Sequence, residues 1–382
     1  MIRPAAALAA LLFACPAAAL PVPDPPDLKV RSYVLYDYDS GQVLAAHEPS
    51  LRVEPASLTK VMLTYVAFDE LRQGRVRPDD LVLVSEKAWR QGMDSKESRM
   101  FIEVGKRVAV KDLLRGIIVQ SGNDASVALA EHLAGTEATF AELMTRYAQQ
   151  LGMKDTRFAN ASGVPAEAQY TSARDMALLA HALIRDFPEQ YAQFKEREFT
   201  FNKIRQPNRN RLLWRDPSVD GIKTGHADEA GYHLLASAVR DGRRLITVVL
   251  GSEGEDARAQ QSIALLNYGF RFYETMPVAG AGEPLLTIRA WQGERKELAL
   301  GLEAPLVVSV PRGGGDRVEL LPQADGRVYA PVPPGRSLGT LKVVLDGEVL
   351  RSEPLVALSA LPEGNLWRQI TDGVQLWMQD TF

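Results

Sequence analysis

The sequence has little that could bind a metal ion or a nucleic acid. It holds one cysteine, Cys15, and five histidines that show no HExxH or other metal-ligand spacing, so we expect no metal and no cofactor. Its 44 lysines and arginines stand against 48 aspartates and glutamates, which gives a formal net charge of -4. Because nucleic-acid binding needs a clear excess of positive charge, we predict no nucleic-acid partner.

The N-terminus has an apolar run, but it is too short to cross a bilayer, which takes about 20 apolar residues. Arg3 supplies a positive charge, the apolar run extends from Ala5 to Ala14, and Ala17–Ala19 offers small residues for cleavage. This is the pattern of a secretory signal. We therefore expect residues 1–19 to be a signal peptide and the mature protein to be exported.

Cleavage after Ala19 would also remove Cys15. The mature protein would then work in an oxidising space without a disulfide, so that its hydrophobic core alone must stabilise it. A competing interpretation takes residues 12–15 as a lipoprotein box in which Cys15 carries lipid. The bulky Phe13 disfavours that alternative.

The length of 382 residues and a 46% hydrophobic composition predict two or three globular domains. In residues 28–277, hairpin signals at 33–48 and 234–250 enclose a helical middle. Further stretches with helical character are 55–73, 110–119, 125–134, 137–151, 171–185 and one that ends near 274. We predict an α+β domain in which the two hairpins form one antiparallel sheet that carries a helical subdomain.

After Pro277 the sequence pattern changes to short apolar runs separated by glycine and proline. This pattern predicts a small all-β domain over residues 278–363. Residues 364–382 have helical spacing again. One face of that predicted amphipathic helix would hold Leu366, Trp367, Ile370, Val374, Trp377 and Met378. We expect this face to lie on a membrane surface; a helix docked on the β domain, or a dimer contact, is the alternative.

Ser57 and Lys60 are the first candidate pair for chemistry. Residues three apart on a helix lie on one face, about 5–6 Å apart, so the Lys60 amine would lie beside the Ser57 hydroxyl. An amine with a lowered pKa can take the proton from a serine and make it a nucleophile. The structural alternative is that Ser57 caps a helix and Lys60 is solvated.

Ser121-Gly122-Asn123 stands where one apolar helix ends and the next begins. Such residues are common at helix junctions for structural reasons alone. The functional interpretation gives Ser121 a hydroxyl that relays protons and gives Asn123 an amide that orients substrate and Lys60.

Lys223-Thr224-Gly225 directly precedes an apolar strand that begins at Gly231. We expect Gly225 to let a ligand backbone approach the strand edge, where a Cβ would obstruct it. Lys223 and Thr224 could hold a carboxylate, and the charge of Lys223 would lower the pKa of Lys60. His226 follows, either as a contact on the leaving-group side or as a turn residue.

The order SxxK, SxN, KTG resembles that of the penicillin-recognising serine acyl-transferases. Further stretches are similar to the low-molecular-mass penicillin-binding proteins, specifically the exported D-alanyl-D-alanine carboxypeptidases of the penicillin-binding protein 5/6 type. They include PASLTK, QSGNDA, YTSARDMALLAHALIRDFPE, NRNRLLW, VDGIKTGHADEAGYHLLASA and NYGFRFYET. The likeness covers nearly the whole chain from about residue 28, including the β domain and the C-terminal helix.

The resemblance implies a carboxypeptidase that removes the terminal D-alanine from peptidoglycan stem peptides and is acylated by β-lactams. Ser57 would be the nucleophile, Lys60 its general base and Ser121 a proton relay. The oxyanion would lie between the backbone N–H of Ser57 and one just past Gly225, at His226 or its neighbour. The implied substrate-binding residues are Asn123, Lys223, Thr224, Gly225 and His226. The C-terminal helix would hold the enzyme on the periplasmic face of the inner membrane.

Two stretches depart from the family pattern. Gly251-Ser252-Glu253 lacks an arginine that often follows the glycine and could hold the terminal carboxylate, so Arg258, or Lys223 with Thr224, would have to supply that contact. The loop around residues 93–99 also differs in composition. Both departures leave the preferred stem peptide open.

Three other functions fit the same scaffold. A serine β-lactamase would need an added carboxylate base in an ExxLN-like loop, and the sequence has no such stretch. A D,D-endopeptidase is closer, although the appended C-terminal domain favours a carboxypeptidase. A non-catalytic cell-wall-binding protein would not need the intact Ser57, Lys60, Ser121, Asn123 and Lys223.

Overall fold

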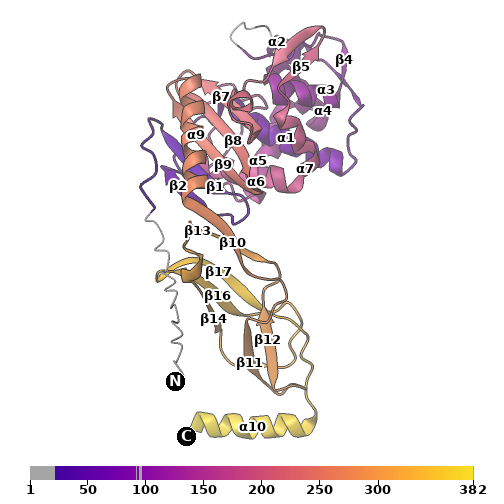
Figure 1. Ribbon diagram of the computed structural model, residues 1–382. Coiled ribbons are helices and arrows are strands. Elements are labelled where there is room, and N and C mark those ends of the chain that lie inside the picture. Colours follow the sequence, from indigo (N-terminus) through magenta and orange to yellow (C-terminus); the bar gives the residue numbers. More distant parts are fainter. Residues whose placement is uncertain (1–21, 92, 94–96, 382) are drawn as a thin grey trace, which may run out of the picture. The chain divides into compact units, whose positions relative to one another are not determined.

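The computed structural model describes residues 22–91, 93 and 97–381, in which the chain forms two compact units (Figure 1). Residues 24–275 with 307–309 make up one unit, and residues 276–306 with 310–382 make up the bulk of the other. The predicted signal peptide and lipoprotein box lie outside the described residues.

The first unit is built on a five-stranded antiparallel sheet with the order β2-β1-β9-β8-β7. Its strands are β1 (Ser32–Asp37), β2 (Val43–His47), β7 (Val219–Ala227), β8 (Gly231–Arg240) and β9 (Arg243–Ser252). The two predicted hairpins meet where β1 pairs with β9, with Val34 opposite Val248. The predicted α+β class is therefore confirmed, and β7 is an edge strand.

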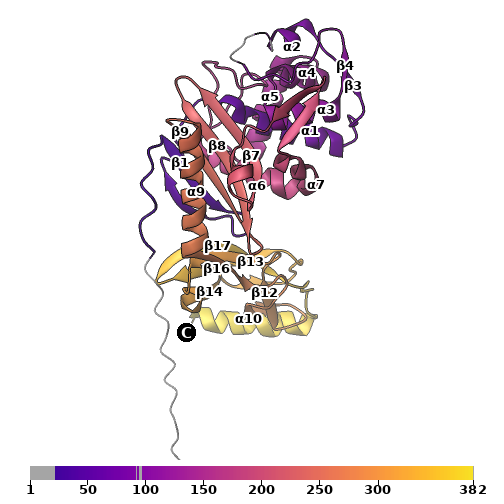
Figure 2. The ribbon, with the colours of Figure 1, turned by 45° about the horizontal axis from the view of Figure 1, so that its top comes forward.

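Helices cover both faces of this sheet (Figure 2). Helix α9 (Glu255–Phe272) packs on one face, where the Leu35 and Leu245 side chains lie so close to Gly269 that a Cβ there would overlap Leu245. The opposite face packs on the helical subdomain through Val34, Val248 and other core residues. Burial on both faces explains why these strands are apolar runs rather than alternating ones.

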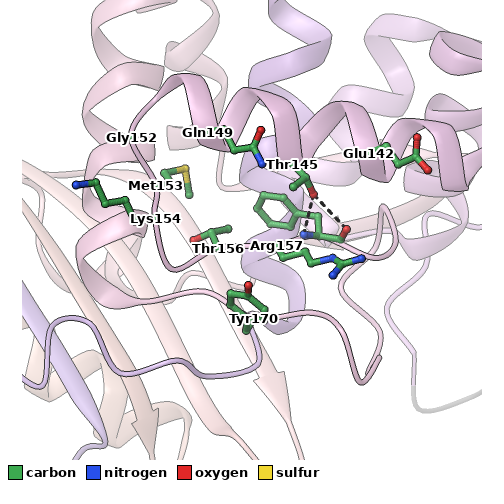
Figure 3. Close-up of a pocket in the computed structure, with 10 residues that line it drawn as sticks. Glu142, Thr145, Gln149, Gly152, Met153, Lys154, Thr156, Arg157 and Tyr170 are labelled. Carbon is green, nitrogen blue, oxygen red and sulfur yellow. Dashed lines mark hydrogen bonds between the residues drawn. The ribbon is translucent and has the colours of Figure 1, made fainter.

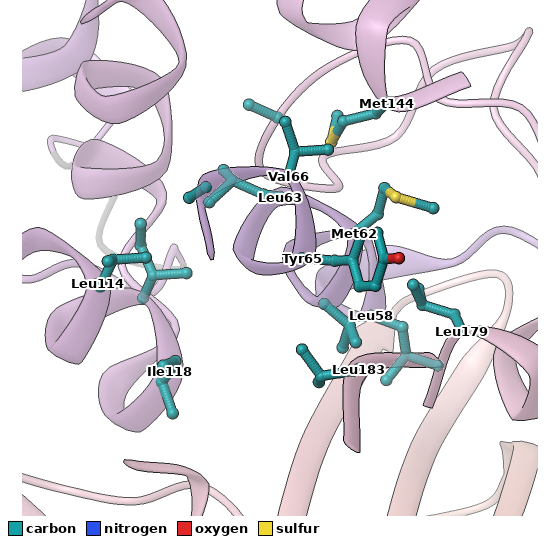
Figure 4. Close-up of a cluster of buried hydrophobic side chains, with 14 of the residues drawn as sticks. Leu58, Met62, Leu63, Tyr65, Val66, Leu114, Ile118, Met144, Leu179 and Leu183 are labelled. Carbon is teal, nitrogen blue, oxygen red and sulfur yellow. The ribbon is translucent and has the colours of Figure 1, made fainter. Parts of the chain in front are cut away.

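The helical subdomain surrounds α1 (Thr59–Arg72), which is buried from Thr59 to Glu70. Around α1 lie α3 (Val110–Arg115), α4 (Asn123–Ala134), α5 (Glu137–Gln150) and α6 (Ala173–Asp186). Figure 4 shows Leu63 and Val66 of α1 among side chains from α3, α5 and α6. Because α1 is packed on every side, it forms a firm base for the residues at its N-terminus.

Shorter elements complete this unit. They are the helices α2 (Glu86–Gln91), α7 (Pro188–Tyr191) and α8 (Leu212–Arg215) and the hairpin strands β3 (Leu81–Leu83), β4 (Arg107–Ala109), β5 (Glu198–Phe201) and β6 (Ile204–Pro207). The chain between α2 and β4 contains the loop that the sequence analysis found unusual in composition.

Three local predictions need correction. The helix expected over 110–119 is α3 followed by a π-helical turn, η2 (Gly116–Gln120), which ends at Ser121 in the left-handed region with φ of 69°. The last helix ends at Phe272, two residues before the predicted end. Lys223-Thr224-Gly225 precedes the strand predicted from Gly231, which is β8, but the motif also lies inside a strand of its own, β7, where hydrogen bonding to β8 compensates for its lack of an apolar pattern.

The second unit is the predicted all-β domain. Six strands form a sheet in the order β14-β16-β17-β12-β11-β15. They are β11 (Leu286–Trp291), β12 (Glu297–Gly301), β14 (Val318–Ala324), β15 (Val328–Tyr329), β16 (Ser337–Leu345) and β17 (Glu348–Ala357). A two-stranded sheet joins β10 (Tyr273–Ala279) to β13 (Leu306–Pro311).

Helix α10 (Leu366–Thr381) is the last element of the described chain (Figure 1), and polar side chains attach it to the β domain. The Asp372 carboxylate, which is 4% exposed, accepts a hydrogen bond from the backbone N–H of Gln292 at 2.7 Å. Arg289 donates a hydrogen bond to the side chain of Gln375 at 2.7 Å. Leu376, on the inner face of α10, is buried. The helix thus docks as the alternative interpretation required, yet its predicted apolar face stays open.

That apolar face consists of the six predicted residues, all of them exposed: Leu366, Trp367, Ile370, Val374, Trp377 and Met378. Trp367 is 77% exposed and Trp377 is 64% exposed. Of the helices in the described part of the chain, none has the length and apolar character needed to cross a bilayer.

Candidate active site

Ser57 lies in a short 3-10 turn, η1 (Ala56–Leu58), that leads into α1. The preceding residue, Ala56, has a φ of +47°, a conformation that is uncommon for a residue other than glycine. Its carbonyl packs so closely on Gly163 that a Cβ there would overlap it. The half-buried Ser57 side chain is therefore held by a strained turn between the rigid helix α1 and a tightly packed loop.

Lys60 follows one turn later with its amine fully buried, at 1% exposed. Lys60 Nζ donates to Ser57 Oγ at 3.1 Å and to Asn123 Oδ1 at 2.7 Å, and it also donates to the carbonyl oxygen of Ser162. Burial lowers the pKa of Lys60 from 10.5 to about 7, although the charges of Glu97 and Asp124 act in the opposite direction. The amine is thus available as a base near neutral pH.

Ser121 and Asn123 reach the site from the junction between η2 and α4. Asn123 is the first residue of α4, and its amide oxygen contacts Lys60. Ser121 is 3% exposed, and its hydroxyl forms no hydrogen bond within the described residues. A buried hydroxyl without a partner is costly unless another molecule satisfies it, which makes Ser121 a free polar group in the site.

Lys223 lies in the edge strand β7 and is 2% exposed. Its Nζ donates to the carbonyl oxygen of Thr224 at 3.2 Å. Burial, followed by the charges of Lys60, Arg209 and Arg258, lowers its pKa well below the ordinary value. The sequence predicts that Lys223 lowers the pKa of Lys60; burial is the largest cause of that lowered pKa, and the charge of Lys60 lowers the pKa of Lys223.

Gly225 was expected to make room for a ligand backbone, but its open side faces the turn that carries Ser57. A Cβ there would lie 3.2 Å from the carbonyl oxygen of Pro55 and 3.4 Å from the Cβ of Ala56. The glycine therefore lets the turn that carries Ser57 pack directly on β7. His226, whose side chain is 42% exposed, stacks on Tyr232 with 4.1 Å between ring centroids.

Arg258 was a candidate to replace the arginine that is absent after Gly251. In the structure it forms a hydrogen bond with strand β7. It extends from α9, is 5% exposed and donates to the carbonyl oxygen of Gly225 at 3.0 Å. Burial lowers its pKa to about 10. Its guanidinium therefore supports the backbone of β7 from the side of α9.

The structure adds residues that the sequence analysis missed. The carbonyl of Ser162 contacts Lys60, and the Glu97 carboxylate accepts a hydrogen bond from Asn123 Nδ2. Asp124 fixes the chain after Glu97, since its carboxylate accepts from the backbone N–H groups of Met100 at 2.8 Å and Phe101 at 2.9 Å. These contacts join loops far apart in sequence, and only the unusual composition around 93–99 gave a signal.

His233, expected to pack within a strand, is fully buried in β8 behind the site. Its Nδ1 accepts from the backbone N–H of Gly251 at 3.0 Å, so its Nε2 donates to the carbonyl oxygen of Glu54 at 3.0 Å. Burial lowers its pKa to about 4. The neutral ring thus links β9 to the segment before Ser57.

A separate hollow of about 550 Å³ lies between α5 and the segment that follows it (Figure 3). Thr145 points into it and forms hydrogen bonds with the backbone of Phe158. None of the predicted site residues lines it.

The comparison with known proteins is consistent with the site described above and with the two units of the fold. Residues 20–254 match the family model described as D-alanyl-D-alanine carboxypeptidase. Residues 273–363 match the model of the penicillin-binding protein 5 C-terminal domain. The D-alanyl-D-alanine carboxypeptidase DacA of Escherichia coli is 42% identical over 94% of this chain and 91% of its own length.

Two solved structures are also similar. Penicillin-binding protein 5 from Haemophilus influenzae has a TM-score of 0.86 and 41% identity, covering 89% of this chain and 99% of that one. Penicillin-binding protein D2 from Listeria monocytogenes, solved in its cefotaxime-bound form, has a TM-score of 0.59 and 27% identity, covering 65% of this chain and 100% of that one. The resemblance drawn from the motifs is thereby confirmed: the chain belongs to the D-alanyl-D-alanine carboxypeptidase family of penicillin-binding proteins.

Proposed function

We propose that this protein is a serine-type D-alanyl-D-alanine carboxypeptidase that acts on peptidoglycan stem peptides. The observation that carries the proposal is the Ser57–Lys60 pair: a serine hydroxyl 3.1 Å from a buried amine whose pKa is lowered to about 7. Because a neutral amine can take the serine proton near physiological pH, the pair has the chemistry of an activated nucleophile.

The acylation step follows from this pair. Lys60 Nζ takes the proton of Ser57 while Ser57 Oγ bonds to the carbonyl carbon between the two D-alanines. The C–N bond then breaks, and the leaving amine receives a proton from Lys60 directly or through Ser121, whose buried hydroxyl is unpartnered among the described residues. Water hydrolyses the ester of Ser57 in the second step and restores the enzyme.

Substrate positioning is assigned to the edge strand β7. An extended peptide can add to an open sheet edge by main-chain hydrogen bonds, and β7 is such an edge. Lys223 and Thr224 would hold the terminal carboxylate, with Asn123 and His226 as further contacts. Backbone N–H groups of Ser57 and of the segment just past Gly225 would stabilise the oxyanion. β-Lactams would acylate Ser57 in the same way.

We also propose that the mature protein is exported and lies on the periplasmic face of the inner membrane. The N-terminal signal pattern supports export, and the exposed apolar face of α10 supports peripheral attachment. Two tryptophans exposed on one face are stabilised by placement at a lipid interface, where amphipathic rings are favoured.

The decisive experiment measures D-alanine release from a peptide that ends in D-Ala-D-Ala. The intact protein should release D-alanine, Ser57→Ala should not, and Ser50→Ala, an exposed serine seven residues away, should act as the parent does. Absence of release from the intact protein would shift the proposal to a D,D-endopeptidase or a non-catalytic wall-binding protein. Release that survives in Ser57→Ala would mean that another residue is the nucleophile.

A further inference from the structure

The loop between α2 and β4 brings a carboxylate to the amide of Asn123. Glu97 accepts a hydrogen bond from Asn123 Nδ2, while the backbone N–H of Asn123 donates to the carbonyl oxygen of Ser98 at 2.8 Å. Asp124 holds the following residues by their backbone N–H groups. The residues that follow Glu97 are therefore held against α4 by their backbone groups. These contacts position the half-buried side chain of Glu97.

The amide of Asn123 has two orientations that differ only in exchanging oxygen and nitrogen. Glu97 as a carboxylate can only accept a hydrogen bond, so it selects the orientation with Nδ2 towards the loop. The amide oxygen then faces Lys60, 2.7 Å from Nζ. Glu97 therefore determines which atom of Asn123 the catalytic amine meets.

This orientation matters when Lys60 is neutral. A neutral amine has two hydrogens and one lone pair, and Nζ has three polar neighbours: Asn123 Oδ1, the carbonyl of Ser162 and Ser57 Oγ. The first two can only accept, so they take the two hydrogens. The lone pair is left towards Ser57 Oγ, which can donate. A flipped Asn123 would present hydrogens to Nζ and compete with Ser57 for the lone pair.

We propose that Glu97 is a positioning residue for acylation: by fixing the orientation of the Asn123 amide, it keeps the lone pair of Lys60 directed at Ser57. This inference rests on the proposed function. Glu97 touches neither the nucleophile nor the base, and it acts through Asn123.

Glu97 has a second, opposing effect. Its negative charge raises the pKa of Lys60 against the larger effect of burial. The hydrogen bond should therefore increase the maximum rate of acylation, whereas the charge should move the rise of that rate to higher pH. The facing charged groups are Asp124, which also raises this pKa, and Lys223, whose own pKa responds to the charge of Lys60.

Three variants separate the two effects. Glu97→Gln keeps an acceptor for Asn123 Nδ2 but removes the charge, Glu97→Asp keeps the charge but shortens the reach, and Glu97→Ala removes both. Glu103→Ala is the matched control, because Glu103 is an exposed glutamate of the same segment. Thermal unfolding of each variant verifies that it is folded, and the Gln and Asp variants decide the question if Glu97→Ala is not.

The measurement is the rate of Ser57 acylation by a fluorescent penicillin across pH 5.5–9, an approximate range chosen to span the lowered pKa of Lys60. We expect the plateau rate at high pH to fall about tenfold in the Asp and Ala variants, as for one lost hydrogen bond, and to stay near that of the parent in the Gln variant. The rise with pH should move to lower pH in the Gln and Ala variants and stay in place in the Asp variant.

Parent-like plateaus in both Glu97→Asp and Glu97→Ala would overturn the proposal, as would a plateau in Glu97→Gln as low as that in Glu97→Ala. Failure of the proposed function has a different signature. The parent protein would then release no D-alanine, while penicillin acylation would still report on the positioning of Lys60 and Ser57.

Discussion

The surroundings of Ser57 and the open face of α10 break opposite rules of folding. At the site, amines that water would solvate well are buried: Lys60 is 1% exposed and Lys223 is 2% exposed. On α10, tryptophans that would be stable in a core face solvent, with Trp367 77% exposed. Between these two extremes, the described chain buries a large cluster of apolar side chains in an ordinary hydrophobic core.

The contrast shows how each region can be used. A buried charge is costly unless the group becomes neutral, and neutrality is what a base needs. An exposed apolar face is tolerated only at an expense in solubility, and it marks an interaction surface. Under the proposed function, both regions give up stability for a role, one through desolvation of amines and the other through hydration of indole rings.

The largest expected effect tests whether Lys60 serves as a base or only as a charge. Lys60→Arg keeps a cation but not a group that can lose its proton. Acylation by a fluorescent penicillin should fall by about 10²–10⁴-fold, the usual contribution of a general base. Lys111→Arg, on the exposed surface, is the control. An arginine variant that is acylated at the parent rate would remove Lys60 from the role of base.

The next effect concerns the open face of α10. Changing Trp367 and Trp377 together to glutamate should weaken binding to vesicles of phosphatidylethanolamine and phosphatidylglycerol by about 100-fold, because each indole loses apolar burial worth about 1.4 kcal/mol, or a factor of about ten. Co-sedimentation measures this, and Thr371→Glu adds charge to the same helix without removing a tryptophan. Hydrolysis of a soluble peptide should not change. Vesicle binding as strong as that of the parent would assign this face to another partner.

A smaller effect concerns His233, a buried polar group behind the site. Burial lowers its pKa from 6.5 to about 4, so between these pH values the unfolded chain binds a proton that the folded chain does not. The stabilisation that comes from keeping His233 neutral is complete above about pH 6.5 and is lost as the pH falls to about 4. The free energy of unfolding changes by roughly 3 kcal/mol over this range.

Denaturant unfolding at several pH values measures this dependence. His233→Gln should lower stability at neutral pH and flatten its decline towards pH 4, whereas His132→Gln, at an exposed histidine, should leave the decline unchanged. A parent-like decline in the His233 variant would mean that other groups cause the loss of stability in acid.

The smallest effect concerns the attachment of α10 to the β domain. Asp372→Ala leaves the backbone N–H of Gln292 without its partner and should destabilise the docked helix by about 1–3 kcal/mol. Hydrogen–deuterium exchange of α10 amides should then be correspondingly faster. Asp372→Asn keeps an acceptor and should show a smaller change. Unaltered exchange in Asp372→Ala would show that Leu376 and Arg289 hold the helix without it.

The elements that were predicted correctly have local causes. The spacing of apolar residues located α1, α4, α5 and α6, and glycine at turns located the hairpins. A local cause also places Ser57 beside Lys60, because side chains three residues apart on a helical turn lie on the same face. The six residues of the exposed face of α10 follow from periodicity alone.

What was missed depends on contacts between segments distant in sequence. The strand that carries Lys223 has no apolar pattern and forms only because β8 pairs with it. Glu97 and Ser162 belong to loops, where no periodicity indicates which side chain or carbonyl faces the site. Arg258 was named for a substrate contact, and only the packing of α9 showed that it supports the backbone of β7.

The sequence by itself determined the class of fold, the order of the three motifs and the pairing of Ser57 with Lys60, because each depends on residues near one another in the chain. Only the tertiary structure decided the pKa of Lys60 and the orientation of its neighbours. Desolvation requires a whole core to close around the amine, and the oxygens of Asn123 and Ser162 that accept its hydrogen bonds belong to parts of the chain that meet only after folding.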